Sequence, residues 1–449
     1  MLTRVEIDGF KTFEQFSLDL QPFSAIVGPN ASGKSNLFDA LRFLSLLAQT
    51  DIRSAMVGLR GEPEELFRRT AAGTANEMRF AIEVLLNDTG TDAFGTTYTV
   101  RAQRLRYELT LTLRMDKRGV PLGIYVTHER CQAIARKGDR AKFLAKEDIS
   151  YSHRKNPFID MSEDQSRVFQ IRQDGPAESG TSKRGRPVLL SASEASRTAL
   201  STIATAEFPH LYALRDLLTS LRFLEINPVA ARSTNDRYID TKSLRSDASN
   251  LAAILAHLKS ETSSEKRPDG VINDISADLS SLIPSVRKIE VFDEPSAKEY
   301  AFGVRTSDGL NFSSRIISDG TLRILALLAI LDDPNRRGIL CFEEPENGVH
   351  EGRMEALITL LRNAAELPTR STDPYFQILV NTHSPAVLDV LSKQELIAAD
   401  VITVTDPVSK ARQTRTRMRI GPQDGEFDFE HHLTRTETKH LLRRPGGEV

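Results

Sequence analysis

Eight residues near the start of the chain have the types and the spacing that bind a nucleoside triphosphate. They read Gly28-Pro29-Asn30-Ala31-Ser32-Gly33-Lys34-Ser35 and match the pattern G-x-x-x-x-G-K-[ST]. In this pattern glycines let backbone amides curl around the phosphates, the lysine balances β- and γ-phosphate charge, and the serine hydroxyl binds Mg²⁺. A β-rich run at 23–27 precedes the loop and a helical pattern at 36–47 follows it. This strand, loop and helix context argues against a chance glycine turn.

A second group of candidate residues lies where an apolar strand ends in carboxylates. Residues 339–342 are apolar, and Glu343 and Glu344 follow them, before Pro345 and Glu346. At the carboxyl edge of a sheet, one carboxylate can hold Mg²⁺ through water, and the next can polarise the water that attacks a γ-phosphate. The alternative interpretation is a solvated acidic turn.

Two further polar turns are candidates for the same site. Ser318 and Gly320 open an apolar helical stretch, and the serine with the free amides of a helix start can bind an anion. By itself, however, that pattern indicates only a capped helix. His383 follows the apolar run 376–380 within an Asn-Thr-His-Ser sequence, where it can sense a γ-phosphate; a structural histidine is the alternative.

Alternation of apolar and polar residues predicts the elements that position these groups. Residues 3–20 indicate a hairpin around Gly9, and three β-rich runs indicate a β-subdomain at 78–86, 98–113 and 123–131. Helical patterns at 195–205, 210–221 and 249–258 predict an inserted helical lid without a sustained heptad. Helices at 321–331 and 353–363 alternate with strands at 338–342 and 376–380, which implies a parallel sheet.

We therefore expect a chain organised in four parts. The first holds the phosphate loop and the β-subdomain, the second is the helical insertion, the third holds the other candidate residues, and the last is a mobile tail with little apolar periodicity. The expected boundaries are 1–190, 191–265, 266–420 and 421–449. A basic SKRGR sequence at 182–186 is interpreted as a solvated loop, with phosphate contact as the alternative.

Composition excludes several classes of protein. Apolar residues make up 40% and charged residues 27% of the 449, a balance typical of packed soluble proteins. The net charge of -2 means that any affinity for nucleic acid must come from local basic patches. Cys131 and Cys341 are interpreted as buried free thiols in a reducing cytosol. With no signal peptide and no run of about 18 apolar residues, we expect a cytoplasmic protein without a membrane partner.

Together the four motifs resemble those of the ATP-binding-cassette (ABC) ATPases. Within them they are similar to the soluble branch that includes structural maintenance of chromosomes (SMC) proteins, RecF and the OLD nucleases, and the motifs follow that family's order. The opening Ile7, Phe10, Lys11 and Phe13 resembles the branch's first strand. The S-D-G-T and E-E-P-E-N-G motifs are most similar to stand-alone bacterial AAA-type ATPases of anti-phage systems such as Septu, Gabija and PARIS. The resemblance is good over 1–50 and 300–390.

The resemblance implies an α/β fold: a P-loop NTPase of the ABC-ATPase head type, with an antiparallel β-subdomain and an inserted helical lid. It implies ATP and Mg²⁺ as cofactors and a head-to-tail homodimer, or a higher oligomer, with two ATP molecules sandwiched. The loop from Gly28 to Asn36 would bind ATP, with Ser318 and Gly320 contacting the γ-phosphate from the other subunit. Ser35 and Glu343 would hold the metal, and the residues with catalytic roles would be Lys34, Glu344 as base and His383 as switch.

Several positions depart from the family's pattern. Ala31 replaces a glycine of the phosphate loop, and Glu343 replaces the usual aspartate, which lengthens the reach to Mg²⁺ by one methylene. Asp319 and Thr321 stand where a transporter would have glycine and glutamine, which disfavours coupling to a membrane partner. The family's Q-loop glutamine has no clear equivalent, and Gln103 is a candidate only because it lies in the β-subdomain.

The leading hypothesis is an ATPase that serves as sensor or regulatory engine in a bacterial anti-phage or DNA-maintenance complex and controls a partner effector such as a nuclease. A RecF-like repair ATPase that binds DNA directly and an autonomous ATP-gated nuclease are alternatives, as is a scaffold that hardly turns ATP over. The chain ends shortly after His383, so we do not expect the Toprim domain of OLD enzymes. The tail carries Glu426, Asp428, Glu430, His431 and His432 without a recognisable metal spacing.

Overall fold

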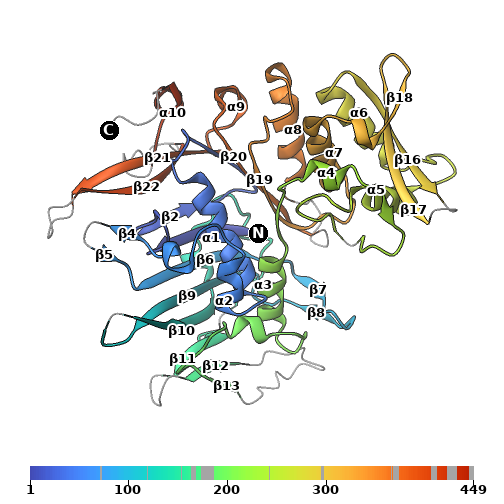
Figure 1. Ribbon diagram of the computed structural model, residues 1–449. Coiled ribbons are helices and arrows are strands. Elements are labelled where there is room, and N and C mark those ends of the chain that lie inside the picture. The colour runs from blue at the N-terminus through green and yellow to red at the C-terminus, as the bar shows by residue number, and fades with distance from the viewer. Residues whose placement is uncertain are drawn as a thin grey trace.

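The computed structural model describes residues 1–443 with several gaps, and Figure 1 shows its arrangement. Outside the described residues lie 71–72, 119, 153, 163–167, 173–186, 242, 295–297, 366, 368–373, 406–411, 422–431 and 444–449. The basic sequence at 182–186 and four of the five tail residues considered as metal ligands therefore lie outside the described part.

A six-stranded sheet forms the centre of the molecule. Its order is β14-β19-β20-β3-β21-β22, and all neighbours are parallel except the final antiparallel pair. Every residue of β3 and β20 is buried, as expected for a parallel sheet covered on both faces. The strands predicted at 23–27, 338–342 and 376–380 are confirmed. The bounds are Leu221–Phe223 (β14), Gly338–Glu343 (β19), Phe376–Thr382 (β20), Phe23–Val27 (β3), Leu396–Thr405 (β21) and Arg412–Ile420 (β22).

An eight-stranded antiparallel sheet packs beside it, in the order β13-β12-β11-β10-β9-β6-β1-β2. The predicted hairpin of the first twenty residues and the predicted β-subdomain are both present. The bounds are Leu2–Asp8 (β1), Phe16–Asp19 (β2), Glu77–Leu85 (β6), Arg104–Met115 (β9), Pro121–Ala133 (β10), Ile159–Ser162 (β11), Val168–Ile171 (β12) and Val188–Ser191 (β13). Small pairs are formed by Arg69–Thr70 (β4) with Gly73–Thr74 (β5) and by Thr89–Thr91 (β7) with Thr97–Thr99 (β8).

The single strand predicted over 98–113 is wrong, because the chain breaks between β8 and β9. His210 is buried there, and its Nε2 accepts the backbone N–H groups of Arg101 and Ala102 at 3.1 and 3.0 Å. Those backbone groups are therefore bonded to a side chain and not to a neighbouring strand.

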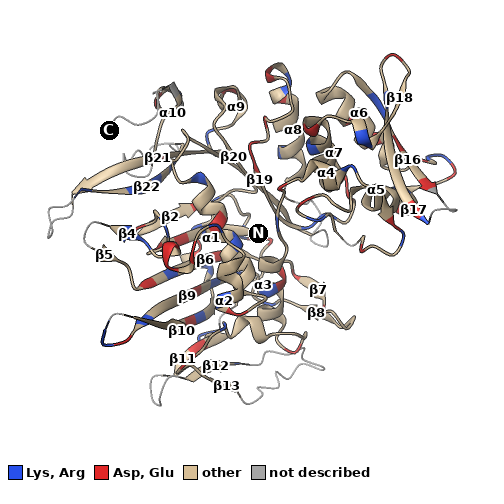
Figure 2. Cartoon of the chain, in the orientation of Figure 1, with Lys and Arg blue, Asp and Glu red and all other residues tan. Residues whose placement is uncertain are grey.

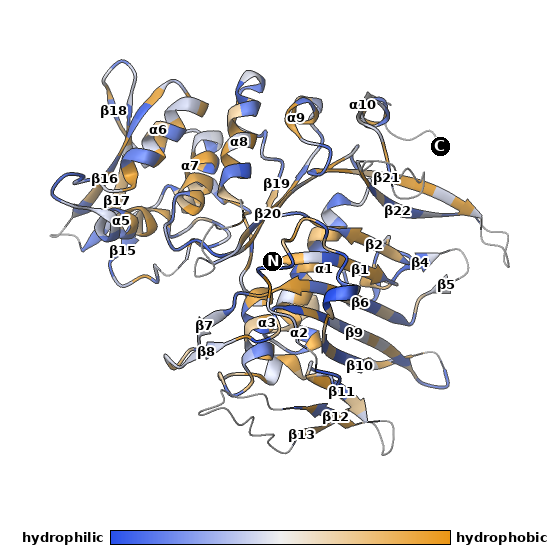
Figure 3. Ribbon diagram, turned by 180° about the vertical axis from the view of Figure 1, so that it is seen from behind, coloured by the Kyte–Doolittle hydropathy of each residue, from blue (hydrophilic) through white to orange (hydrophobic). Residues whose placement is uncertain are grey.

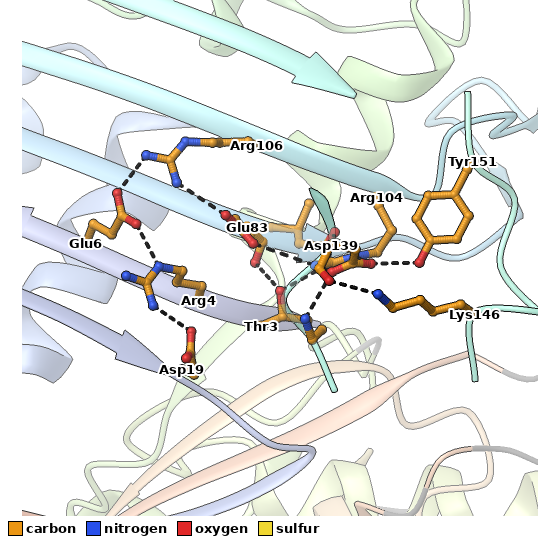
Figure 4. A network of polar contacts seen from close by, with 12 residues as sticks. Thr3, Arg4, Glu6, Asp19, Glu83, Arg104, Arg106, Asp139, Lys146 and Tyr151 are labelled. Atoms are coloured by element: carbon orange, nitrogen blue, oxygen red, sulfur yellow. Dashed lines mark hydrogen bonds and ion pairs between the residues drawn. The ribbon is translucent and has the colours of Figure 1, made fainter. Parts of the chain in front are cut away.

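A buried ionic network ties the eight-stranded sheet to the segment that follows β10 (Figure 4). Arg104 is completely buried and donates two hydrogen bonds of 2.8 Å to the Asp139 carboxylate. Its remaining donors reach the Thr3 hydroxyl at 2.9 Å and the Val84 carbonyl at 2.7 Å, while the Tyr151 hydroxyl donates to Asp139. Because each charge has partners, this buried pair escapes most of the cost of leaving water.

Ten α-helices are described, and nine of them divide between two hydrophobic core clusters. Helices α1 to α3 pack with the eight-stranded sheet in the first cluster, and α4 to α9 pack on the other side in the second. Figure 3 shows α7 as strongly hydrophobic. The bounds are Lys34–Leu47 (α1), Ile52–Val57 (α2), Pro209–Thr219 (α3), Pro228–Ala231 (α4), Leu251–Thr262 (α5), Ile272–Leu282 (α6), Asp319–Leu331 (α7), Met354–Ala364 (α8), Pro385–Val390 (α9) and Arg435–Arg443 (α10).

A small antiparallel sheet accompanies the second cluster. It comprises Asn235–Asp236 (β15), Glu299–Thr306 (β17), Val286–Glu294 (β16) and Asn311–Ser313 (β18). Buried residues of this sheet pack in the second cluster with α5 and α6. The part of the chain that the structure describes contains no helix that is both long and apolar enough to cross a bilayer.

Three segments differ from the sequence-based expectations. The helix expected at 195–205 is only a short 3-10 turn, Leu200–Thr202, because the buried Glu129 carboxylate accepts the backbone N–H groups of Ala199 and Leu200. The segment 191–265, expected as an insertion, supplies β14 to the central sheet. The segment 421–449, expected as a mobile tail, contains α10, in which Thr438 is fully buried.

Candidate functional site

The phosphate loop connects the buried strand β3 to α1, and its backbone turns sharply twice. Gly33 caps α1 with φ of +88°, and Ala31 adopts φ of +63°. A left-handed conformation costs a residue with a side chain roughly 1–2 kcal/mol, so Ala31 carries strain that a glycine would not. A Cβ on Gly28 would overlap the Ala399 carbonyl of β21, and one on Gly33 would overlap the Thr416 hydroxyl of β22.

Lys34 points back into the loop. Its Nζ donates hydrogen bonds of 2.8 Å to the carbonyl oxygens of Gly28 and Pro29. Burial lowers the pKa of Lys34, and the carboxylates of Glu344, Glu346 and Glu343 act in the opposite direction. The lysine of the loop and the acidic end of β19 therefore share one electrostatic environment.

The remaining loop residues are held mainly by neighbouring strands. Ser32 is buried, and its hydroxyl has no hydrogen-bond partner among the described residues. Asn36 donates from Nδ2 to the Thr12 hydroxyl at 2.9 Å, and Thr12 in turn contacts the Thr416 hydroxyl at 2.7 Å. The β21–β22 hairpin, which sequence reasoning missed, thus forms one wall of the loop.

Glu343 is the last residue of β19 and pairs with Asn381 of β20. Burial raises the pKa of Glu343; Glu225, Asp39 and Glu344 add to this as like charges, while Arg60 lowers it. Asp39, on α1, bonds the Lys11 ammonium at 2.6 Å. The carboxylate of Glu343 is thus partly desolvated, which favours its capture of a cation.

Glu344 and His383 meet where β19 and β20 end. Glu344 adopts φ of +48°, and its backbone N–H donates to the carbonyl of Asn381 at 2.8 Å. One oxygen of the Glu344 carboxylate accepts from Asn347 Nδ2 at 2.8 Å, and the other lies 3.5 Å from His383 Nδ1. The strained turn thus brings the carboxylate beside the imidazole at the edge of the sheet.

Glu346 is a site residue to which sequence reasoning gave no role. Its Oε1 accepts the Thr382 hydroxyl at 2.7 Å and the His383 N–H at 3.3 Å. The only available sequence signal was a third acid in the run Glu343-Glu344-Pro345-Glu346, which spacing alone does not separate from an exposed acidic turn.

The turn from Ser318 to Thr321, called the signature turn below, lies at the start of α7. Ser318 is the N-cap of α7, and its hydroxyl accepts the Thr321 N–H at 3.2 Å. Asp319 forms an ion pair with Arg232. A Cβ on Gly320 would lie 2.6 Å from the Cα atom of Gly348, so the start of α7 touches the loop that follows β19.

Lys34, Glu343, Glu344 and His383 thus come together at the carboxyl ends of three neighbouring strands, β3, β20 and β19. Ser318 and Gly320 lie at the start of α7, whose apolar residues pack in the second core cluster, whereas those of α1 pack in the first. One side chain links the turn to the acidic strand: Arg323 donates to the Glu343 carbonyl and lies 4.8 Å from the centre of the Phe342 ring.

The residues present fit a magnesium ion held together with a nucleotide. No cluster of three or more His, Cys, Asp or Glu side chains suited to a metal occurs among the described residues. Mg²⁺ in nucleotide sites, however, takes only one or two protein ligands, with phosphate oxygens and waters supplying the rest. The Ser35 hydroxyl and the desolvated Glu343 carboxylate are ligands of that kind.

Gln103 lies away from this constellation. It is buried in the β-subdomain, where its Nε2 donates to the Leu86 carbonyl at 3.1 Å and its Oε1 accepts the Ser150 N–H at 2.9 Å. Both ends of the amide are therefore used within the scaffold, and Gln103 does not fit the Q-loop glutamine.

Comparison with protein families gives two matches. The model described as "AAA domain, putative AbiEii toxin, Type IV TA system" matches residues 152–389, more than half of the chain. The model described as "RecF/RecN/SMC N terminal domain" matches residues 1–120. The first match contains the signature turn, the acidic strand and His383, and the second contains the phosphate loop.

Curated relatives match over short segments only. The chain is 52% identical over 44 residues to the chromosome partition protein Smc of Methanocaldococcus jannaschii, and 45% identical over 60 residues to structural maintenance of chromosomes protein 4 of Caenorhabditis elegans. These segments are 10% and 13% of this chain and 4% of each relative.

Solved structures that overlap the chain include the Smc head bound to the C-terminal winged-helix domain of ScpA and the SMC head domain of Thermotoga maritima. Both are 12% identical in sequence, with TM-scores of 0.46 and 0.37. The overlaps cover 93% and 94% of this chain and 97% and 99% of those chains.

Proposed function

The chain belongs to the family described as "AAA domain, putative AbiEii toxin, Type IV TA system", with the P-loop ABC-type ATPase fold of the SMC and RecF group, and on this premise we propose that it binds and hydrolyses ATP between two copies of itself. The observation that carries the proposal is the meeting of Lys34, Glu343, Glu344 and His383 at the carboxyl edge of three adjacent strands. Ligands of open α/β sheets bind at this edge.

Each residue has a defined task in this proposal. The loop amides from Gly28 to Asn36 cradle the phosphates, and Lys34 exchanges the carbonyls of Gly28 and Pro29 for phosphate oxygens. Ser35 and Glu343 would hold Mg²⁺, which neutralises charge on the β- and γ-phosphates.

Glu344 receives the proton of the attacking water, and its contact with His383 places the imidazole where it can meet the γ-phosphate. Ser318 and Gly320 complete the site from a second copy. This assignment is supported by their place at the start of α7, a helix that packs in a different hydrophobic cluster from α1.

ATP turnover by the purified chain tests this function. We expect the rate per chain to rise with protein concentration, because a complete site needs two copies. Glu344→Gln should lower kcat by roughly 100-fold or more while nucleotide binding is retained, since the variant keeps the shape of the side chain but loses the base. A kcat unchanged by Glu344→Gln would contradict the assignment of the base.

In the cell, we propose that the ATPase is a sensor or regulatory engine of a bacterial anti-phage or DNA-maintenance complex that controls an effector such as a nuclease. Family membership and the S-D-G-T and E-E-P-E-N-G motifs support this role. The Glu344→Gln variant, held in its ATP-bound form, should retain that effector on purification. Retention independent of ATP would speak against control by the nucleotide.

A basic strand favours direct DNA binding as a second candidate function. Arginines recur along β22 (Figure 2), and Arg417 pairs with the carboxylate of Asp400 on β21 at 2.6 Å. The strand itself carries four arginines and no acidic residue. If it contacts phosphates, Arg417→Ala should weaken DNA binding uniformly across sequences and reduce the salt dependence by about one phosphate contact, as measured by mobility shift over a salt series.

A further inference from the structure

The Glu346 side chain is mostly buried against the end of β20. Its side chain is 11% exposed, compared with 43% for Glu344 two residues earlier. It bonds the Thr382 hydroxyl and the His383 N–H through one oxygen, Oε1. Glu346 therefore contacts the backbone of His383 and the side chain of the residue before it.

The His383 ring lies between two carboxylates of unequal exposure. Its Nδ1 is 3.5 Å from Glu344 Oε1 and also 3.5 Å from Glu346 Oε1. Glu344 is the exposed partner, and Asn347 holds its second oxygen. The buried partner, Glu346, is the one that also holds the backbone, so it sets where the ring stands relative to Glu344.

The second oxygen of Glu346 is buried and has no hydrogen-bond partner among the described residues. A buried acceptor without a donor costs about 1–3 kcal/mol, so scaffold packing alone gives no reason for a carboxylate here. Thr382, its hydroxyl partner, is itself fully buried at the end of β20. A buried pair of this kind has little freedom to rearrange.

We propose that Glu346 is a positioning residue for ATP turnover: it fixes the chain from Thr382 to His383 so that the imidazole stands beside Glu344. The inference rests on the proposed hydrolysis of ATP. Glu346 acts through His383 and does not hold the nucleotide. Its loss therefore lowers kcat and leaves ATP affinity almost unchanged.

The test separates kcat from binding in three single variants. Glu346→Ala removes both accepted hydrogen bonds and should lower kcat by roughly 10- to 100-fold, while the dissociation constant of a fluorescent ATP analogue changes by less than about twofold. Glu346→Gln keeps an oxygen that accepts from Thr382 and His383, and should restore most of kcat. Glu351→Gln, at an exposed acid that begins the 3-10 turn Glu351–Arg353, is the matched control and should behave as the wild type.

Thr382→Val provides a second route that leaves Glu346 in place. It keeps the shape of the side chain but removes the hydroxyl, which donates to Glu346 and accepts the Ser384 N–H at 3.0 Å, and should also lower kcat selectively. The double variant should be slower than Glu346→Ala by less than the separate effect of Thr382→Val, because both changes break the hydrogen bond between Thr382 and Glu346. If Glu346→Ala fails to fold, the same selective loss in Thr382→Val still supports the inference, and its absence overturns it.

Three results overturn the inference. These are an unchanged kcat in Glu346→Ala, a loss confined to ATP affinity, or a Glu346→Gln variant as slow as the alanine variant. Turnover in the wild type that depends on Glu344 but not on Glu346 would contradict this inference alone. A wild type without turnover would contradict the proposed function itself and this inference with it.

Discussion

The half of the molecule around α1 and the half around α7 carry different parts of the candidate site. Around α1 lie Lys34 and Ser35, and the carboxylates at the end of β19 act on the Lys34 ammonium. Around α7 lies Ser318, at the start of a helix that packs in a separate hydrophobic cluster. The comparison teaches that one chain holds the two kinds of surface on different helices, which is the arrangement that the proposed pairing of two copies requires.

The two halves also differ in whether a buried charged side chain has hydrogen-bond partners. In the first half, the buried Arg104 donates hydrogen bonds to Asp139, Thr3 and the Val84 carbonyl. In the second, Asp332 ends α7 with Oδ2 buried and without a hydrogen-bond partner in the described structure. The first arrangement stabilises a scaffold, whereas the second leaves a cost that a substitution can remove.

Mixing two inactive variants is the strongest test of whether the α1 half of one chain works with the α7 half of another. Lys34→Ala disables the α1 half and Ser318→Arg the α7 half, and each alone should lose activity by a factor of about 10³. A mixed dimer contains one intact pair of surfaces, so an equal mixture should recover about a quarter of the wild-type ATPase rate if chains pair at random. A mixture as inactive as its components would place both halves of a site in one chain.

Removing the buried guanidinium tests the scaffold of the first half. Arg104→Ala leaves the Asp139 carboxylate buried without its cation and should lower the free energy of unfolding by about 3–5 kcal/mol, measured by urea denaturation. The exposed pair of Arg79 with Glu77 is the control, and Arg79→Ala should change stability by less than about 1 kcal/mol. Equal effects at the two positions would refute the structural role of the network.

Substitution of Asp332 should change the free energy of unfolding least, and it should raise this free energy where Arg104→Ala lowers it. Burial raises its pKa to about 7, the like charges of Asp278 and Asp274 add to this, and Arg336 opposes it. Because the folded state holds the proton more tightly than the unfolded state, this group's contribution to stability is complete below pH about 4 and is lost as the pH rises through about 7.

Asp332→Asn should therefore raise the free energy of unfolding at pH 8 by about 1–2 kcal/mol and have little effect at pH 4. Urea denaturation of both proteins across this pH range measures the difference. A stability gain that is the same at both pH values would show that the carboxylate's charge is not the cause.

Much of the central sheet could be predicted from the sequence, because buried parallel strands read as short apolar runs next to glycine or acidic residues. The hairpin of β21 and β22 could not, since β22 alternates arginine and threonine and its burial depends on the phosphate loop beneath it. The absence of a helix over 195–205 could not be predicted from the sequence either. It depends on Glu129, a carboxylate more than 60 residues away in sequence.

For the candidate site, sequence spacing predicted which strand ends would carry polar groups, and the structure places Lys34, Glu343, Glu344 and His383 at one edge. Their roles in binding and turnover stay predictions. The contribution of Glu346 was not foreseeable, because it depends on which oxygen of a third acid meets Thr382. Part of the expected mobile tail is helical for a similar reason, since Leu442 of α10 packs against the second core cluster.

The contact between Gly320 and Gly348 has a mechanical consequence. Side chains at a packed interface can absorb a small displacement by changing rotamer, but neither glycine has one, and their backbones touch directly. A shift of the loop that follows β19 therefore acts directly on the first turn of α7, because no side chain lies between the two backbones. A displacement of Asn347, which precedes Gly348 and donates to Glu344, would therefore press on the start of α7.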